Sequence, residues 1–114
     1  MLTDITGIDG SFRALAEPRR REILRLVRGD EMTSGAIAAH FDVTGPAISQ
    51  HLGVLLEAGL VTMRREGTKR LYRAAPDRLR DVRAYLAGFW EASLEELKSE
   101  AEEDERRRRD ASAN

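Results

Sequence analysis

The stretch from Thr44 to Gly59, TGPAISQHLGVLLEAG, constrains the fold most, because it predicts one helix with two chemically different faces. Thr44 is suited to cap the start of a helix, and Pro46 falls in the first turn, where its missing N–H costs nothing. Apolar side chains recur at i, i+4 and i+7 and predict a core face: Ile48, Leu52 and Leu55. The other face carries small or polar residues: Pro46, Ser49, Gln50 and Gly53. We therefore expect a helix that packs on one side and allows close approach on the other.

Three shorter helices are predicted before this one. The first covers residues 11–16, the second begins at Pro18 and ends at Gly29, and the third is capped by Thr33 or Ser34. Apolar residues recur with helical spacing in each: Phe12, Leu15 and Ala16; Ile23, Leu24 and Val27; Ile37, Ala38 and Phe41. We expect residues 1–10 to form a flexible N-terminus.

After Gly59 the apolar period becomes alternating, which predicts a β-hairpin that turns at Glu66-Gly67-Thr68. Pro76 and Asp77 then open a long helix with an apolar stripe at close to every 3.5 residues, which calls for a partner helix. The stripe and the residues that widen it are Leu79, Val82, Leu86, Phe89, Trp90, Ser93, Leu94 and Leu97. The predicted fold class is mainly α with a small β-hairpin, a winged helix-turn-helix of order α-α-α-α-β-β-α. One domain covers residues 11–97, and residues 98–114 form a charged helix end or tail.

Charge is distributed unevenly along the chain, although the formal net charge is only -1. Residues 44–73 carry five basic and two acidic side chains, a balance of +3, whereas residues 76–114 carry eight basic and eleven acidic ones, a balance of -3. A basic segment of this kind suits a nucleic-acid partner. The absence of cysteine excludes disulfides, thiolate metal sites and a cysteine nucleophile. No apolar run approaches a membrane span and no signal peptide is evident, so we expect a cytoplasmic protein.

Two short helices with a tight turn, followed at once by a basic hairpin, are typical of winged helix-turn-helix proteins that bind double-stranded DNA. The major groove admits one helix, whose outer side chains must be short enough for close approach and polar enough to read base edges. Gln50 can pair with an adenine edge, and Thr44 at the helix start can hold a phosphate. The basic hairpin can straddle the phosphate backbone. The predicted DNA-binding residues are Thr44, Pro46, Ala47, Ser49, Gln50, Gly53, Arg64, Arg65, Lys69 and Arg70.

Four parts of the sequence resemble the ArsR-type winged-helix repressors, over about residues 12–97: LAEPRRREILRLV, PAISQHLGVLLEAGLV, RREGTKRLYR and the Phe89-Trp90 pair. The resemblance implies a recognition helix from Pro46 to Ala58 and repression of a neighbouring operon or of the protein's own gene. It also implies a homodimer formed by the first and last helices. The predicted dimer-interface residues are Phe12, Leu15, Leu79, Val82, Leu86, Phe89, Trp90 and Leu94.

Many ArsR-type repressors release DNA when a metal binds, but this sequence resembles the branch without an evident metal site. The family's sites use cysteines before the recognition helix, or Asp, His and Glu on the last helix. This chain has no cysteine and no histidine after His51, so we expect no metal and no other cofactor. A lone His51 at the inner shoulder of the recognition helix is more typical of a packed or hydrogen-bonded residue than of a metal ligand.

Other functions fit the sequence less well than DNA binding does. An enzyme is not expected, because Ser49 and His51 point about 200° apart on a helix and cannot act as nucleophile and base. A winged-helix module that binds protein would expose large apolar groups where this chain has Ser49, Gln50 and Gly53. A metal-responsive repressor with an unusual site is the other alternative. Phe89 and Trp90 could line a ligand pocket, although their place in the apolar stripe favours a dimer seam.

Overall fold

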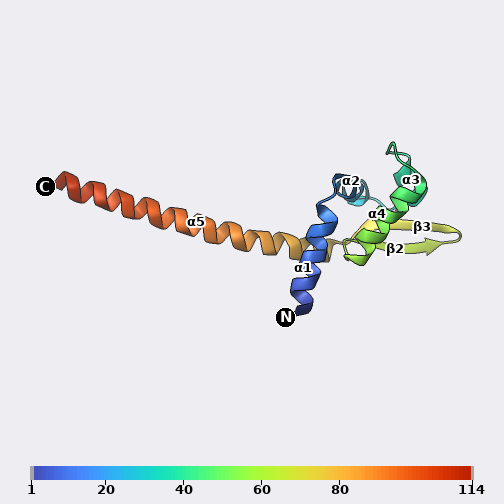
Figure 1. Ribbon diagram of the computed structural model, residues 1–114, viewed down its shortest axis with the longest axis horizontal. Helices are drawn as coiled ribbons and strands as arrows, with labels where there is room; N and C mark the ends of the chain where they lie inside the picture. Colours follow the sequence, from blue (N-terminus) through green and yellow to red (C-terminus); the bar gives the residue numbers. More distant parts are fainter. Residues whose placement is uncertain (1, 114) are drawn as a thin grey trace. The chain divides into compact units, whose positions relative to one another are not determined.

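The computed structural model describes the backbone of residues 2–113 and the side chains of residues 7–112, in two compact units that divide after Val82. The elements follow the predicted order with one added strand (Figure 1). They are α1 (Leu2–Leu15), α2 (Pro18–Val27), β1 (Met32–Thr33), α3 (Ser34–Ala38), α4 (Gly45–Glu57), β2 (Val61–Glu66), β3 (Lys69–Ala74) and α5 (Pro76–Ala113).

The predicted caps of α3 and α4 are confirmed. The Thr33 Oγ1 accepts the backbone N–H of Ala36 at 3.1 Å, and the Thr44 Oγ1 accepts that of Ala47 at 3.3 Å. Gly59 ends α4 with a φ of 75°, which glycine adopts without strain. The chain is thereby turned directly from α4 into β2.

At the end of α4, two hydrogen bonds form the reciprocal pattern of a Schellman motif. The N–H of Gly59 donates to the Leu56 carbonyl and that of Leu60 to the Leu55 carbonyl, each at 3.0 Å. These bonds satisfy carbonyls that would otherwise lack a partner at the end of the helix. The start of β2 is therefore held in a defined place relative to α4.

The sheet has three antiparallel strands in the order β1-β3-β2. The hairpin is as predicted, with Glu66 opposite Lys69 and a turn at Gly67, whose φ is 63°. Strand β1 was not predicted, because two residues are too few to show an alternating pattern. It pairs Met32 with Tyr72 and Thr33 with Leu71.

The core lies between the helices and one face of this sheet, and it contains the apolar residues that the helical spacing selected. Ile23 and Val27 of α2, Ile37 of α3 and the inner face of α4 are fully buried or nearly so. The sheet contributes Val61, Tyr72 and Ala74 on one face, as strand alternation requires. Burial of the α4 inner face fixes which of its side chains point outward.

The ends of two helices differ from the sequence expectation. The first helix begins at Leu2 rather than at residue 11, so α1 covers a segment that was expected to be flexible. That segment contains Gly7 and Gly10, which lower helix propensity, and the Arg78 guanidinium lies so close to Gly7 that an added Cβ would meet it at 2.7 Å. Helix α3 ends at Ala38, while Phe41 packs against the core from the following turn.

Beyond Leu97, helix α5 contains almost no apolar residues, and intrahelical ion pairs stabilise it instead. Acidic residues stand four positions before arginines, the favourable orientation on a helix. The pairs are Glu103–Arg107, Asp104–Arg108 and Glu105–Arg109, at 4.0, 2.8 and 3.2 Å. Residues 98–113 are therefore a charged helical segment, one of the two forms expected from the sequence.

Replacing Leu52 with alanine tests the role of the α4 inner face. Leu52 is fully buried, so Leu52→Ala should reduce the free energy of unfolding by about 2–5 kcal/mol through lost burial and a residual cavity. Glu57→Ala at an exposed position of the same helix should change it by about 0.5 kcal/mol or less. Urea denaturation followed by circular dichroism measures both. Equal losses would contradict the packing described here.

Candidate nucleic-acid interface

The outward face of α4 is exposed and its polar groups have no partners. Ser49 and Gln50 are exposed, and neither makes a side-chain hydrogen bond to another described residue. Thr44 and Pro46 at the helix start are also exposed, and Ala47 is half-buried. This face can present short hydrogen-bonding groups to a base edge without first breaking an internal bond.

Gly53 lies in the middle of this outward face, where a glycine has no role in the fold. A methyl group added at its Cα would meet nothing within 4 Å, and its backbone φ is not positive. Glycine inside a helix costs about 1 kcal/mol relative to alanine. The described residues therefore give Gly53 no structural reason, whereas a partner that approaches the helix backbone would give it one.

The four predicted cations of the wing divide between its two faces. Side chains alternate along a strand, so Arg65 shares a face with Met63, and Arg70 shares it with Tyr72, the face that packs toward the helices. Arg65 and Arg70 are directly opposite each other in the register. Arg64 and Lys69 belong to the outer face.

Two facing guanidinium groups repel each other across a strand pair. No carboxylate contacts Arg65 or Arg70 among the described residues, so their charge is uncompensated within the described part of the chain. An anion placed between them would relieve the repulsion. The helix-facing side of the wing end is thus suited to a phosphate.

On the outer face, Arg64 is already paired. Its Nε donates to Glu31 Oε2 at 2.7 Å, and its Nη1 lies 3.1 Å from Glu66 Oε2. The hydrogen bond from Arg64 lowers the pKa of the Glu31 carboxyl, and the same bond raises the pKa of Arg64. Because the pKa of Glu31 is lowered, the link is present at neutral pH and is lost only as the pH falls through that lowered value.

Glu31 was not among the predicted site residues, since no local pattern connects it to a residue 33 positions later.

The two histidines are used in hydrogen bonds within the chain. Arg20 Nη1 lies 3.3 Å from His51 Nδ1, and Arg20 Nε donates to the Ala14 carbonyl at 2.7 Å. Since a guanidinium can only donate, His51 Nδ1 is the acceptor in this contact. His40 Nδ1 lies 3.0 Å from the Ala36 carbonyl. The prediction that His51 is hydrogen-bonded is confirmed.

Among the residues that the structure describes, no three His, Cys, Asp or Glu residues are grouped closely enough to hold a metal ion. Nor does any described helix combine the length and the apolar content needed to cross a membrane.

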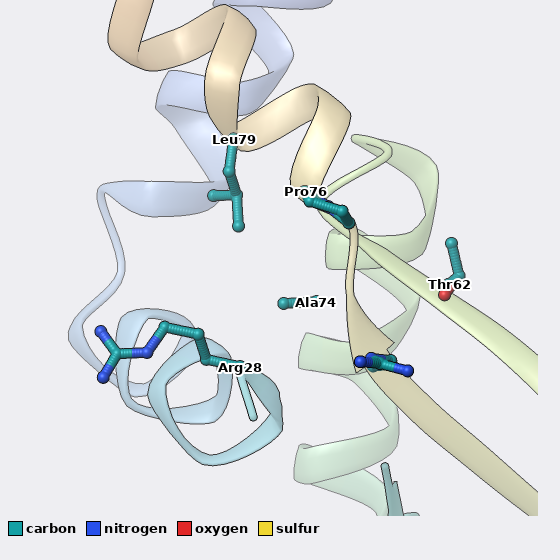
Figure 2. A pocket seen from close by; sticks show the side chains of 6 residues that line it. Arg28, Thr62, Ala74, Pro76 and Leu79 are labelled. Atoms are coloured by element: carbon teal, nitrogen blue, oxygen red, sulfur yellow. The ribbon is translucent and has the colours of Figure 1, made fainter. Parts of the chain in front are cut away.

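A cavity of about 400 Å³ lies at the root of the wing, at the opposite end of the hairpin from Arg65 and Arg70. Figure 2 shows Leu79 pointing toward Ala74, with the Arg28 side chain directed away from both. The cavity is lined by Arg28, Thr62, Arg73, Ala74, Pro76 and Leu79. It is therefore separate from the outward face of α4 and from the wing end.

Several predicted dimer-interface residues form an exposed apolar surface on the part of α5 after Arg83. We call this the α5 stripe: Leu86, Phe89, Trp90, Leu94 and Leu97, with Tyr85 beside Phe89 in an edge-to-face contact at 5.2 Å. Phe89 and Trp90 are 61% and 67% exposed. Val82, in contrast, is only 5% exposed, and Leu79 packs against the core of its own chain. Phe12 and Leu15 are half-buried.

Comparisons with known proteins agree with this geometry. A helix-turn-helix domain model matches residues 15–64. The transcriptional repressor SdpR of Bacillus subtilis is 37% identical over 78 residues, which are 68% of this chain and 87% of that protein. The HTH-type transcriptional regulator Rv2034 of Mycobacterium tuberculosis is 38% identical over 86 residues, which are 75% of this chain and 80% of that protein.

Solved structures are similar as well. A possible transcriptional regulator for arsenical resistance has a TM-score of 0.66 and 44% identity, covering 77% of this chain and 92% of that one. An ArsR family transcriptional regulator has a TM-score of 0.69 and 30% identity, covering 82% and 94%. The fold and the relatives together define a DNA-binding transcriptional regulator of the winged helix-turn-helix class. Within that class, the chain belongs to the ArsR-type family, whose members include named repressors, as the sequence predicted.

Replacing Gly53 with alanine tests whether a partner approaches α4 closely. Gly53→Ala should raise the free energy of unfolding by about 0.5–1 kcal/mol and at the same time weaken DNA binding, because the added methyl group would stand on the face of α4 that we expect to enter the groove. Gly88→Ala in α5, where a methyl group is also unhindered, is the matched control and should stabilise without changing DNA affinity. Urea denaturation and fluorescence anisotropy measure the two quantities. Unchanged DNA affinity in Gly53→Ala would argue against close approach.

Proposed function

We propose that this repressor acts as a homodimer on a palindromic operator, with α4 of each copy in the major groove and the wing beside it on the backbone. The observation that carries the proposal is the outward face of α4. It is exposed and polar, its side chains Ser49 and Gln50 make no hydrogen bond to another described residue, and it contains a glycine to which the described residues give no structural role. Two recognition helices of a symmetric dimer would lie about 34 Å apart, one turn of DNA.

The contacts divide by chemistry. Ser49 and Gln50 read base edges, because they are the outward side chains with donors and acceptors. Pro46, Ala47 and Gly53 are small and let the helix enter the groove. The Thr44 hydroxyl can donate a hydrogen bond to a phosphate, because in the helix cap it acts only as an acceptor. Arg65 and Arg70 bind phosphate or a narrow minor groove from the wing, with Lys69 near the turn.

The α5 stripe supports the homodimer. Its large side chains are about half or more exposed, which a single chain in water does not favour for a contiguous apolar surface. A second copy of the same helix would cover the stripe, because the apolar residues recur with the spacing that two packed helices require. Phe12 and Leu15 of α1 are assigned to the same interface by the family resemblance.

Substitutions at Gln50 and Arg65 should separate base reading from phosphate binding. Gln50→Ala should weaken binding to the operator by about 1–3 kcal/mol and leave binding to random duplex nearly unchanged. Arg65→Ala should weaken both and reduce the slope of log affinity against log salt by about 1. Anisotropy titrations at several salt concentrations, on the DNA upstream of the gene and on random duplex, measure these effects.

The same titrations test the function itself. Wild-type affinity for the upstream DNA no better than for random duplex would contradict specific repression of this gene. It would then favour the alternative of a winged-helix module that binds another protein.

The homodimer is tested on the α5 stripe. Trp90→Asp should shift the protein toward monomer in sedimentation equilibrium, because burying the new carboxylate in an apolar interface is costly. Ala84→Asp, at an exposed position about 120° around the same helix from Trp90 and outside the α5 stripe, is the matched control and should stay dimeric. A dimer that tolerates Trp90→Asp would show that this stripe is not the interface.

A further inference from the structure

The ion cluster on the outer face of the wing connects parts of the sheet that are distant in sequence. Glu31 directly precedes β1, which lies at one edge of the sheet, and Arg64 lies on β2 at the other edge. In the register, Arg64 is opposite Leu71, and Leu71 is opposite Thr33. The Arg64 side chain therefore reaches across β3 to join the two edge strands.

The strand at the far end of this link is weakly held by its own backbone. Strand β1 has two residues, so its pairing with β3 supplies little hydrogen bonding. It also leads without a break into α3, the first helix of the helix-turn-helix. A side-chain link from β2 to Glu31 thus connects the wing to the segment that positions the reading helices.

From this geometry we propose that Arg64 is a positioning residue, which holds the wing against β1 through Glu31 with Glu66 as a second counter-ion, and that it makes no phosphate contact. The inference rests on the proposed function, because it assigns phosphate binding to the helix-facing side of the wing and positioning of the wing to its outer face. Arg65 and Arg70, on the helix-facing side and without acidic partners, bind the phosphates. Arg64 lies on the other face, between two carboxylates that repel phosphate.

The salt dependence of DNA binding distinguishes this proposal from the simpler view that every basic residue of the wing binds DNA. A cation that releases a counter-ion from DNA contributes about 0.9 to the slope of log affinity against log salt. Arg65→Met should reduce this slope by about that amount. Arg64→Met should leave the slope at the wild-type value while lowering affinity, because the wing is less well oriented but no phosphate contact is lost. A reduced slope in Arg64→Met, equal to that in Arg65→Met, would overturn the proposal.

A second measurement tests the link without DNA. Hydrogen exchange by NMR reports the opening of the β1–β3 pairing, at whichever of the two opposed pairs, Met32–Tyr72 or Thr33–Leu71, exchanges its backbone hydrogen bonds. Arg64→Met and Glu31→Gln should each speed this exchange by roughly two- to five-fold, the range expected for loss of an exposed ion pair. The double variant should be no faster than either single variant, since both remove the same link.

Arg65→Met is the matched control and should leave the exchange of these amides unchanged. Unchanged exchange in both Arg64→Met and Glu31→Gln would overturn the link. Because this readout needs no DNA, it stands even if the wild-type protein proves not to bind the upstream sequence, so failure of the link and failure of the proposed function remain distinguishable.

Discussion

The burial of the inner face of α4 is the packing interaction on which the rest of the structure depends. Ile48, Leu52 and Leu55 are enclosed by the core, and at 3.6 residues per turn their burial leaves Ser49 and Gln50 pointing outward. The glycine-ended turn after α4 then leads into β2, whose first residue joins the same core. One set of apolar contacts thus positions α4 and the root of the hairpin together.

Electrostatics within the wing follows from the two-residue alternation of its strands. Four basic residues close together in sequence become two cations on the helix-facing side and two on the outer side. Among the described residues, Arg64 is the only one of these four that forms ion pairs, with Glu31 and Glu66. Net charge therefore says less about DNA binding than the face on which each charge lies, and the formal charge of -1 is compatible with a basic, unpaired wing end.

Helix α5 is stabilised in three different ways along its length. Its first turns pack against the core through Leu79 and Val82, its middle part carries the exposed α5 stripe, and its last turns are held by ion pairs between consecutive turns. The first and last parts of α5 are stabilised by contacts within one chain. The middle part is not, because the large apolar side chains of the α5 stripe remain in contact with water. This exposure is the physical basis for expecting a second copy of the chain there.

What the sequence by itself determined is the identity and inner faces of the helices after Pro18, the cap at Thr44, the restriction of the α3 cap to Thr33 or Ser34, the hairpin with its glycine turn and the family. These depend on local spacing and on backbone preferences, which a sequence displays directly. Only the tertiary structure decided where α1 begins, that β1 exists and that Val82 is buried in its own chain. It also decided that Arg64 is paired with Glu31 and that Arg65 is opposite Arg70. Each of these depends on contacts between residues far apart in the chain, and those contacts leave no periodic signal in either segment alone.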